Sequence, residues 1–509
     1  MKRKLMITIL CAGLLAGLTG CAETEKASAP TASDGIWTPM DIEEDSEKID
    51  LSEHAVIVYM TIGTAPTNGA TQEMLDQLNV ILKEKVNAEL AICYIGWEDY
   101  QSVYRLTLEQ MDGRVDLVGT SSQWLDAWTQ ARNGLFLGLT EEMLQTYAPM
   151  TWESVSDEHW EACKFHDSIY LIPEDHYLRW THPGYAYRQE LADEAGLEEG
   201  IHSWEELSDY FQYVGQSHPD QLAWNMEETQ YESLASGWMR SHSSFIPIEG
   251  LGAGQIWGAN QEKPDEIYSP YMTETDSLVE FAKLMKEWNR LGVWKQNASG
   301  VATNAQRCEE GRGFVSGEDG FFCFGEENGN ITEASITQGA MAVCASSRHP
   351  ERALMVYDLL RNDPDCYRLF NYGIQGKQWE IDATGHRIRP DSYEEERDAI
   401  TTNYWWGRND ELEIDDDNRS LETVRRRYDV YGQFIREYPY ESFRPDMSSM
   451  CKQMNELSEI HTDYMTRITF GEYEQTAEEI VAEYQTAMRQ AGVDKVTESL
   501  QKQMKGIIP

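Results

Sequence analysis

The sequence predicts an α/β protein with more than one domain and additional helices at its C-terminus. The chain has 509 residues, which is enough to build more than one hydrophobic core. Residues 55–180 alternate short apolar runs with amphipathic segments, a pattern typical of βαβ units with a mainly parallel sheet. The last 90 residues carry the apolar spacing of amphipathic helices.

The N-terminal segment has the composition of an export signal. Lys2, Arg3 and Lys4 precede the apolar stretch Leu5–Leu18, which is too short to span a bilayer. The stretch ends in Leu-Thr-Gly-Cys, which resembles a bacterial lipobox with Cys21 as the acylated residue. We therefore expect a signal peptide over 1–20 and a lipidated, flexible tether over 21–50. The alternative is an ordinary cleaved signal with a chance cysteine.

The first half of the chain supplies the strands of the expected sheet. Buried strands are predicted at Ala55–Met60, Leu90–Ile95 and Val115–Val118, and helices at Met74–Val86 and Tyr100–Gln110. Ligands of such sheets bind beyond the carboxyl ends of the strands. This rule directs attention to three turns, at 61–69, 96–100 and 119–124.

Later segments continue the mixed pattern. Strands are predicted at Ile169–Pro173, Gly184–Tyr187, Phe314–Ser316 and Gln338–Ala345. Ser203 fits the N-cap of a helix with acidic residues in its first turn, and Pro350 fits a helix start. The stretch 380–420 is polar and irregular, with acidic runs at 394–396 and 415–417. The Asp run lacks the spacing of a calcium loop, so we expect a solvated loop there.

Charge and cysteine usage exclude several classes of protein. The formal net charge is −46, so nucleic acid is a poor partner, and we expect membrane contact only through the lipid anchor. Of nine cysteines, Cys11 would leave with the signal and Cys21 would be lipidated, which leaves an odd number without a CxxC pair. This is neither a disulfide framework nor a zinc signature, and we expect buried thiols with no metal or cofactor.

Several segments together resemble the family-1 extracellular solute-binding proteins of ABC importers, in a Firmicutes-type lipoprotein branch. Ile169–Pro173 resembles the family's crossover strand, Tyr185–Leu191 its strand-to-helix entry and Ser346–Ala353 a helix start. Asn371–Trp379 (Asn-Tyr-Gly-Ile-Gln-Gly-Lys-Gln-Trp) resembles the most specific of these segments, and Tyr484–Gly492 the terminal helices. Arg188 and Gln189 replace the common Asn-Lys pair of the entry segment.

The resemblance implies a type II periplasmic-binding-protein fold, with two α/β lobes, a hinge, an interlobe cleft and C-terminal helices. The implied division places 51–180 plus 338–380 in lobe 1 and 181–337 plus 420–509 in lobe 2, with 381–419 as the acidic insertion. It also implies a monomeric, lipid-anchored protein on the extracytoplasmic face of the cell membrane, which binds a carbohydrate and delivers it to ABC permease subunits. Closure of the lobes around the ligand would present the docking faces.

Aromatic residues are the first candidates for ligand contact, because aromatic planes cover the apolar faces of sugar rings while polar groups bind the hydroxyls. The chain has 16 Trp and 26 Tyr. The predicted ligand-binding residues are Trp97, Trp124, Glu174, Asp175, Trp180, Tyr187, Trp224, Trp238, Phe321, Phe322 and Trp379. For each aromatic, packing in a core or on the surface is the alternative. Trp405 and Trp406 are explained equally well by packing.

Other functions stay open at this point. A peptide or acidic sugar would require cationic residues such as Arg179, Arg188 or Arg240, although all three could be surface charges. Glu174 and Asp175 could form a glycosidase pair, but carboxylates are abundant here, and HExxH, GxSxG and phosphate-binding motifs are absent from the sequence. We therefore expect no enzyme activity. A surface glycan-binding lipoprotein without a transporter is a further alternative.

Overall fold

The structure is a computed structural model in which the chain divides into two units, Met1–Asp50 and Leu51–Pro509. It describes residues 49–98, 100–110, 113–174, 184–219, 223–224, 231–252, 254–294, 305–308, 319–416, 429, 431–505 and 507. The predictions for the signal peptide, Cys21, Asp175, Arg179, Trp180 and the strand at 314–316 lie outside the described residues. Within the described part, no helix combines the length and the apolar character that a bilayer span requires.

A five-stranded sheet with the order β2-β1-β3-β13-β6 organises the first hydrophobic core. Its strands are β1 (Ala55–Ile62), β2 (Ala88–Ile95), β3 (Leu117–Thr120), β13 (Ala340–Val343) and β6 (Ile172–Pro173). β1 pairs in parallel with β2 and β3, whereas β13 runs antiparallel to β3 and β6. Since β6 is antiparallel to β13, it runs in the same direction as β1, β2 and β3, and the mainly parallel arrangement predicted for residues 55–180 is confirmed, with β13 as the reversed strand of this sheet.

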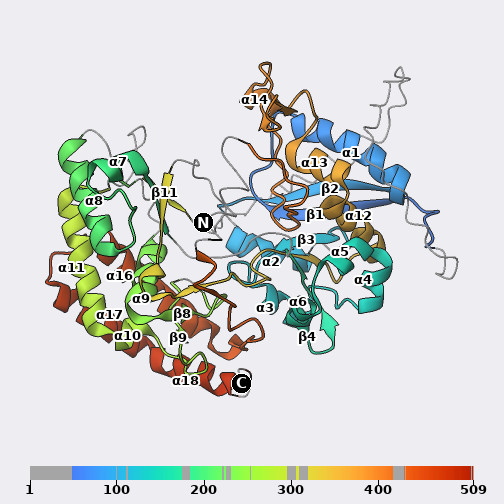
Figure 1. The fold of residues 1–509 in the computed structure, drawn as a ribbon. Coiled ribbons are helices and arrows are strands. Elements are labelled where there is room, and N and C mark those ends of the chain that lie inside the picture. Colours follow the sequence, from blue (N-terminus) through green and yellow to red (C-terminus); the bar gives the residue numbers. More distant parts are fainter. Residues whose placement is uncertain are drawn as a thin grey trace, which may run out of the picture. The chain divides into compact units, whose positions relative to one another are not determined.

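Helices surround this sheet, and α1, α12 and α13 contact one another beside β1 and β2 (Figure 1). The helices of this part are α1 (Ala70–Val86), α2 (Tyr100–Gln110), α3 (Ala127–Arg132), α4 (Glu141–Tyr147), α5 (Pro149–Ser154), α6 (Asp157–Ala162), α12 (Pro350–Asn362), α13 (Pro364–Tyr372) and α14 (Glu395–Asp398). The helix predicted at 100–110 and the start at Pro350 are confirmed.

Several predicted strands have other bounds in the structure, and the strand predicted over 338–345 is shorter, as β13. The third strand begins at Leu117 instead of Val115, and the strand predicted over 169–173 is split into β5 (Ser168–Ile169) and β6. The split occurs because the two halves have different partners: β5 forms a hairpin with β4 (Lys164–Phe165), while β6 pairs with β13. Small hairpins also form between β14 (Glu380–Ile381) and β15 (Arg387–Ile388).

A second hydrophobic core combines the middle of the chain with its C-terminal helices. Figure 1 shows α11, α16 and α17 side by side, in agreement with their contacts. The helices of this part are α7 (Gln189–Glu194), α8 (Trp204–Ser217), α9 (Tyr231–Ser243), α10 (Pro270–Thr273), α11 (Thr275–Leu291), α16 (Cys451–Thr469), α17 (Ala477–Ala491) and α18 (Val493–Met504). Ser203 caps α8 as predicted, since its side chain accepts a hydrogen bond from the Glu206 amide.

Short strands accompany the second core. The antiparallel sheet β10-β7-β11 joins β7 (Gly184–Arg188), β10 (Ala305–Cys308) and β11 (Asp319–Cys323). β8 (Phe245–Pro247) pairs with β9 (Gly258–Asn260), and β12 (Ile331–Thr332) pairs with β16 (Ile435–Arg436). Single 3₁₀ turns, η3 (Glu326–Asn328) and η4 (Ser448–Met450), complete the described elements.

The predicted acidic insertion at 381–419 contributes aromatic side chains to the first core. Tyr404 and Trp406 are buried there. Tyr404 packs edge-on against Tyr59 and Phe370, with ring centroids 5.9 and 5.0 Å apart. Burial of these few large side chains fixes a short apolar segment within a polar stretch of the chain.

Six cysteines are free in the described part of the chain, and four of them are buried as expected: Cys163, Cys323, Cys344 and Cys366. Cys93 is half-buried, whereas Cys451 is exposed at the start of α16. Burial raises the pKa of the Cys323 thiol, which keeps it protonated at neutral pH.

We predict a pH-dependent stability that depends on His461 in the second core. Burial lowers the pKa of this fully buried imidazole to about 3, and Tyr484 contacts its Nδ1 at 2.8 Å. The unfolded chain binds a proton at this histidine below pH of about 6.5, whereas the folded state does not, so stability is lost as pH falls from about 6.5 towards 3. Between pH 6.5 and 5 the loss from this group would be about 2 kcal/mol.

The measurement is urea unfolding of the wild type and His461→Gln across this pH range. The variant should show a shallower decrease in the free energy of unfolding, because glutamine binds no proton. Equal slopes for the two proteins would contradict the prediction.

Candidate functional site

The site is built at the carboxyl ends of β2 and β3, where the turns 96–100 and 119–124 were predicted to bind ligand. Trp97 follows β2 and Trp124 follows β3, and their indoles stack with centroids 5.9 Å apart and an interplanar angle of 21°. Because these strands lie on either side of β1, their ends face the same edge of the sheet. The tertiary structure thus brings together two of the predicted aromatic residues.

Two further indoles from a distant part of the chain complete the group. Trp405 lies against Trp97 at 5.7 Å, and Trp406 stacks on Trp124 at 6.0 Å with an angle of 28°. Tyr100 meets both Trp97 and Trp124 edge-on. We call these five side chains the tryptophan cluster: Trp97, Tyr100, Trp124, Trp405 and Trp406.

The cluster runs from the core to the surface. Trp406 is 1% exposed, Trp124 and Trp405 are half-buried, and Trp97 is 49% exposed. A half-exposed indole held by stacked neighbours presents a rigid apolar face to solvent at low entropic cost. Such a face is a suitable platform for the apolar side of a ring-shaped ligand.

Hydrogen bonds to β1 fix the segment that carries Trp405 and Trp406. The carbonyl of Asn403 accepts from the hydroxyls of Tyr59 and Thr61, both at 2.8 Å, and the Asn403 side chain donates to the Ile62 carbonyl at 2.9 Å. The Tyr357 hydroxyl donates to the Trp406 carbonyl at 2.8 Å. Burial raises the pKa of Tyr59, so its hydroxyl remains a neutral donor.

Polar groups lie beside the cluster. Gln123 precedes Trp124, and its Oε1 accepts a 2.9 Å hydrogen bond from Nε2 of Gln338. The amide of half-buried Gln123 and the exposed carboxylate of Glu98, next to Trp97, are groups that can bind hydroxyls. The surroundings of the exposed indole therefore combine an apolar face with neutral and acidic acceptors.

Glu174, one of the predicted ligand-binding residues, is buried and binds backbone groups in this structure. It is 1% exposed, and its carboxylate accepts from the Arg408 amide at 3.2 Å. The Glu174 amide in turn donates to the Gly339 carbonyl. Glu174 thus connects the segment that follows the tryptophan cluster to the start of β13.

The remaining predicted aromatics are packed in cores. Tyr187, Trp224, Trp238 and Phe322 belong to the second core, Phe321 to a small cluster with Tyr431, and Trp379 packs against Tyr372. Their exposed fractions range from 0 to 9%. These six rings are thus enclosed by protein in this structure, and ligand contact by any of them stays a prediction.

Three members of the cluster, Tyr100, Trp405 and Trp406, were not among the predicted ligand-binding residues, although Tyr100 closes the predicted turn 96–100. The Trp405-Trp406 pair was noted as an aromatic pair, but nothing in its local pattern places it beside β2. Tyr100 was assigned to a helix start, and its contact with both indoles follows from the position of α2.

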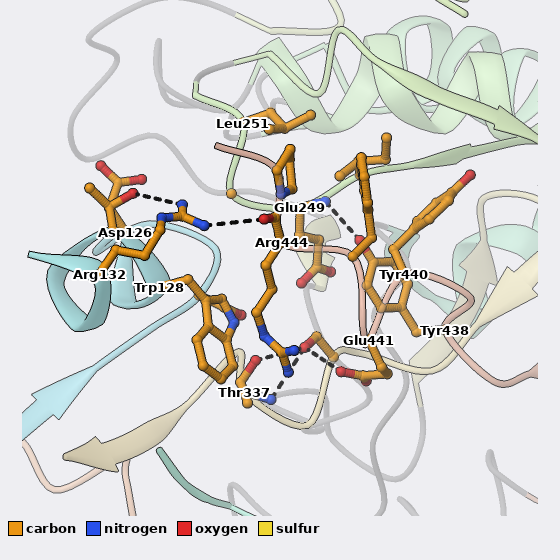
Figure 2. Close-up of a pocket in the computed structure, with 17 residues that line it drawn as sticks. Asp126, Trp128, Arg132, Glu249, Leu251, Thr337, Tyr438, Tyr440, Glu441 and Arg444 are labelled. Atoms are coloured by element: carbon orange, nitrogen blue, oxygen red, sulfur yellow. Dashed lines mark hydrogen bonds between the residues drawn. The ribbon is translucent and has the colours of Figure 1, made fainter. Parts of the chain in front are cut away.

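A cavity lies next to the cluster, beginning at Ser122, two residues before Trp124 (Figure 2). Trp128 and Arg132 of α3 line it on the side of the first core, and Glu249 and Leu251 line it on the side of the second. The segment 438–445 also lines it, with Tyr438, Tyr440, Glu441 and Arg444.

A family model and a curated relative match parts of this sequence. Residues 439–506 match a family described as a domain of unknown function, DUF3502. A curated relative from Streptococcus pneumoniae serotype 4, named carbohydrate ABC transporter substrate-binding protein, is 20% identical over 364 residues, which cover 67% of this chain and 69% of the relative. This finding confirms the resemblance that the sequence motifs indicated.

Solved structures show the fold. The N-glycan transport solute binding protein NgtS from Streptococcus pneumoniae matches with a TM-score of 0.69 and 16% identity, over 89% of this chain and 99% of that one. The alginate-binding protein AlgQ2 matches with a TM-score of 0.58 and 13% identity, over 90% and 100% of the two chains. The chain therefore has the predicted two-lobed α/β fold of solute-binding proteins.

We predict that Gly119→Ala disturbs the tryptophan cluster. A Cβ atom at Gly119 would lie 2.1 Å from Nε1 of Trp406, so this indole must move away from its stack on Trp124. Overpacking of this kind costs about 1–3 kcal/mol of stability. The expected result is a lower unfolding temperature together with a changed near-ultraviolet circular dichroism of the indoles.

Gly96→Ala is the matched control, because no atom lies within 4 Å of a Cβ at this position beside Trp97. It should leave the indole spectrum unchanged. A wild-type spectrum for Gly119→Ala would show that the close contact between Gly119 and Trp406 does not hold the cluster in place.

Proposed function

We propose that this protein is a lipid-anchored, extracytoplasmic solute-binding protein that captures a carbohydrate and delivers it to an ABC importer. The observation that carries the proposal is the tryptophan cluster at the strand ends, with Trp97 half exposed beside neutral and acidic acceptors. Sugar rings have apolar C–H faces bordered by hydroxyls, and this combination of groups complements both. The curated relative's name, which specifies carbohydrate transport, supports the same cargo class.

An oligosaccharide is the favoured cargo. The indoles of Trp97, Trp124 and Trp405 are neighbours, with the Trp97 centroid 5.9 Å from that of Trp124 and 5.7 Å from that of Trp405. NgtS, with the same fold, has been solved with Man1GlcNAc and with Man5GlcNAc, and AlgQ2 is named for alginate binding. A cluster of stacked indoles offers room for more than one sugar residue.

Two cationic candidates do not support an anionic cargo. Arg240 is 4% exposed inside the second core, where burial lowers its pKa to about 10, and Arg188 forms an ion pair with Glu190. Arg179 lies outside the described residues. The formal net charge of −46 also repels anions at long range. We therefore favour an uncharged carbohydrate over a peptide carboxylate or an acidic sugar.

Binding without catalysis is the expected activity. Glu174 is one member of the conceivable glycosidase pair. It is buried, and its carboxylate accepts a hydrogen bond from the Arg408 amide. An acid catalyst must reach the glycosidic oxygen, which this geometry does not allow for Glu174. In the proposed mechanism, cargo held between the lobes favours the closed state because it contacts both of them only there.

The test is titration calorimetry on residues 49–509, since Leu51–Pro509 forms a compact unit of its own. The panel contains Man5GlcNAc, human milk oligosaccharides, alginate oligosaccharides and short peptides. We expect binding of a neutral oligosaccharide, with the affinity reduced at least about tenfold in Trp97→Ala and Trp124→Ala, because each removes a stacking contact worth about 1.4 kcal/mol or more.

Trp152→Ala is the matched control. Trp152 is also half-buried and stacked on a second indole, Trp160, at 5.1 Å, but it lies on α5, outside the cluster. Its substitution should leave the affinity unchanged. Binding of peptides alone would overturn the carbohydrate cargo, and unchanged oligosaccharide binding in both cluster variants would overturn the site.

A further inference from the structure

The segment 438–445, which we call the C-terminal strap, belongs structurally to the second core. It connects β16 to α16, and Tyr438, Tyr440 and Phe443 are buried in that core. The Tyr438 hydroxyl accepts from the Glu249 amide at 2.7 Å and donates to the Pro247 carbonyl at 3.2 Å. These contacts attach the strap to the β8 end of the second core.

Arg444 of the same strap is bound to the first core. Its guanidinium lies 3.8 Å above the centre of the Trp128 ring and donates a hydrogen bond to the Ala162 carbonyl. Arg132 donates from Nη1 to the Arg444 carbonyl at 3.1 Å (Figure 2). Trp128, Arg132 and Ala162 all belong to α3 and α6, beside the first sheet.

Glu441 connects the strap to the place where the chain re-enters the first core. Its carboxylate accepts from the Ser335 hydroxyl and from the Ile336 amide, both at 2.9 Å. Ile336 is buried in the first core, four residues before β13 begins. The strap therefore contacts both helix α3 and a chain crossover.

The loops opposite the strap also meet closely. Gly250 of the second core adopts φ +76°, and a Cβ there would lie 2.3 Å from the Ser122 carbonyl of the first core. The Ser122 amide donates to the Thr337 carbonyl at 2.9 Å. The cavity of Figure 2 is thus lined by residues of both cores and by the C-terminal strap, which contacts both cores.

The contact between Arg444 and Trp128 joins a cation to an indole ring. Burial lowers the pKa of Arg444 to about 10, so the guanidinium is still charged at neutral pH and partly desolvated, which strengthens its attraction to Trp128. Hinges consist of a few residues at element ends that absorb the motion of two rigid bodies. The strap has this position.

We propose that Arg444 is a positioning residue that fastens the second core to the first, so that the C-terminal strap forms the pivot for the movement of the two lobes. This inference gives a role to the region that matches DUF3502, which begins at residue 439. Its helices α16–α18 complete the second core, and its first residues hold the pivot. The pivot is a property of the ligand-free protein, so it can be tested without knowing which ligand the protein binds.

The experiment measures the distance between the lobes by pulsed electron paramagnetic resonance without ligand. Spin labels are attached at Glu84→Cys on α1 and Glu280→Cys on α11, both exposed, in residues 49–509 with Cys93→Ser and Cys451→Ser. We expect a narrow distance distribution with Arg444 present. Arg444→Ala should broaden it and add a population at a different distance, because the lobes lose their fixed pivot.

Trp128→Ala tests the same contact from the first core and should give the same broadening, with little added in the double variant, since each removes one partner of a single interaction. Arg467→Ala is the matched control, because Arg467 lies 5.2 Å above Tyr464 within α16 and connects nothing across the cores. It should leave the distribution narrow.

The two classes of result are distinct. Broadening in Arg444→Ala and Trp128→Ala but not in Arg467→Ala supports the pivot. A wild-type distribution in both strap variants, or equal broadening in Arg467→Ala, overturns it. If Arg444→Ala does not fold, Arg444→Lys replaces it: lysine keeps the charge but not the planar stack, and the distribution should then broaden to a smaller extent.

Discussion

The anchoring of Asn403 over the end of β1 is the interaction on which the site depends. The Asn403 carbonyl accepts hydrogen bonds from the buried hydroxyls of Tyr59 and Thr61. These bonds fix the irregular segment that contains Asn403 against the sheet. With the backbone fixed there, Trp406 enters the first core and Trp405 reaches Trp97. Without this anchor, the exposed indole of Trp97 would keep Trp124 as a neighbour but lose the support of the later segment.

The tryptophan cluster exposes apolar surface on a protein whose formal net charge is −46. The acidic surface repels anions and keeps the body in solution, while the stacked indoles offer one place where an apolar surface is tolerated because the rings support each other. Buried polar groups such as Glu174 bind the neighbouring backbone. Binding would therefore depend on shape and stacking more than on charge.

The two cores are linked by charged and hydrogen-bonded contacts, whereas the tryptophan cluster is held together by contacts between aromatic rings. Around the cavity, Arg444, Glu441 and Arg132 form charged and hydrogen-bonded contacts to backbone and to Trp128. Such directional contacts can rotate slightly while keeping their partners, whereas a tightly interdigitated apolar interface resists sliding. This division separates the surface proposed to hold cargo from the surface proposed to permit closure.

The sequence by itself determined the βαβ series, the helix at 100–110 and the strand-end position of Trp97 and Trp124, because periodicity and topology rules act over short stretches of chain. It could not determine that Tyr187, Trp224 and Trp238 are buried, since an aromatic residue has the same local signature in a core and in a cleft. Only the tertiary structure brought Trp405 to Trp97 and Arg444 to Trp128, because each pair joins residues some 300 positions apart and no local pattern encodes such a contact.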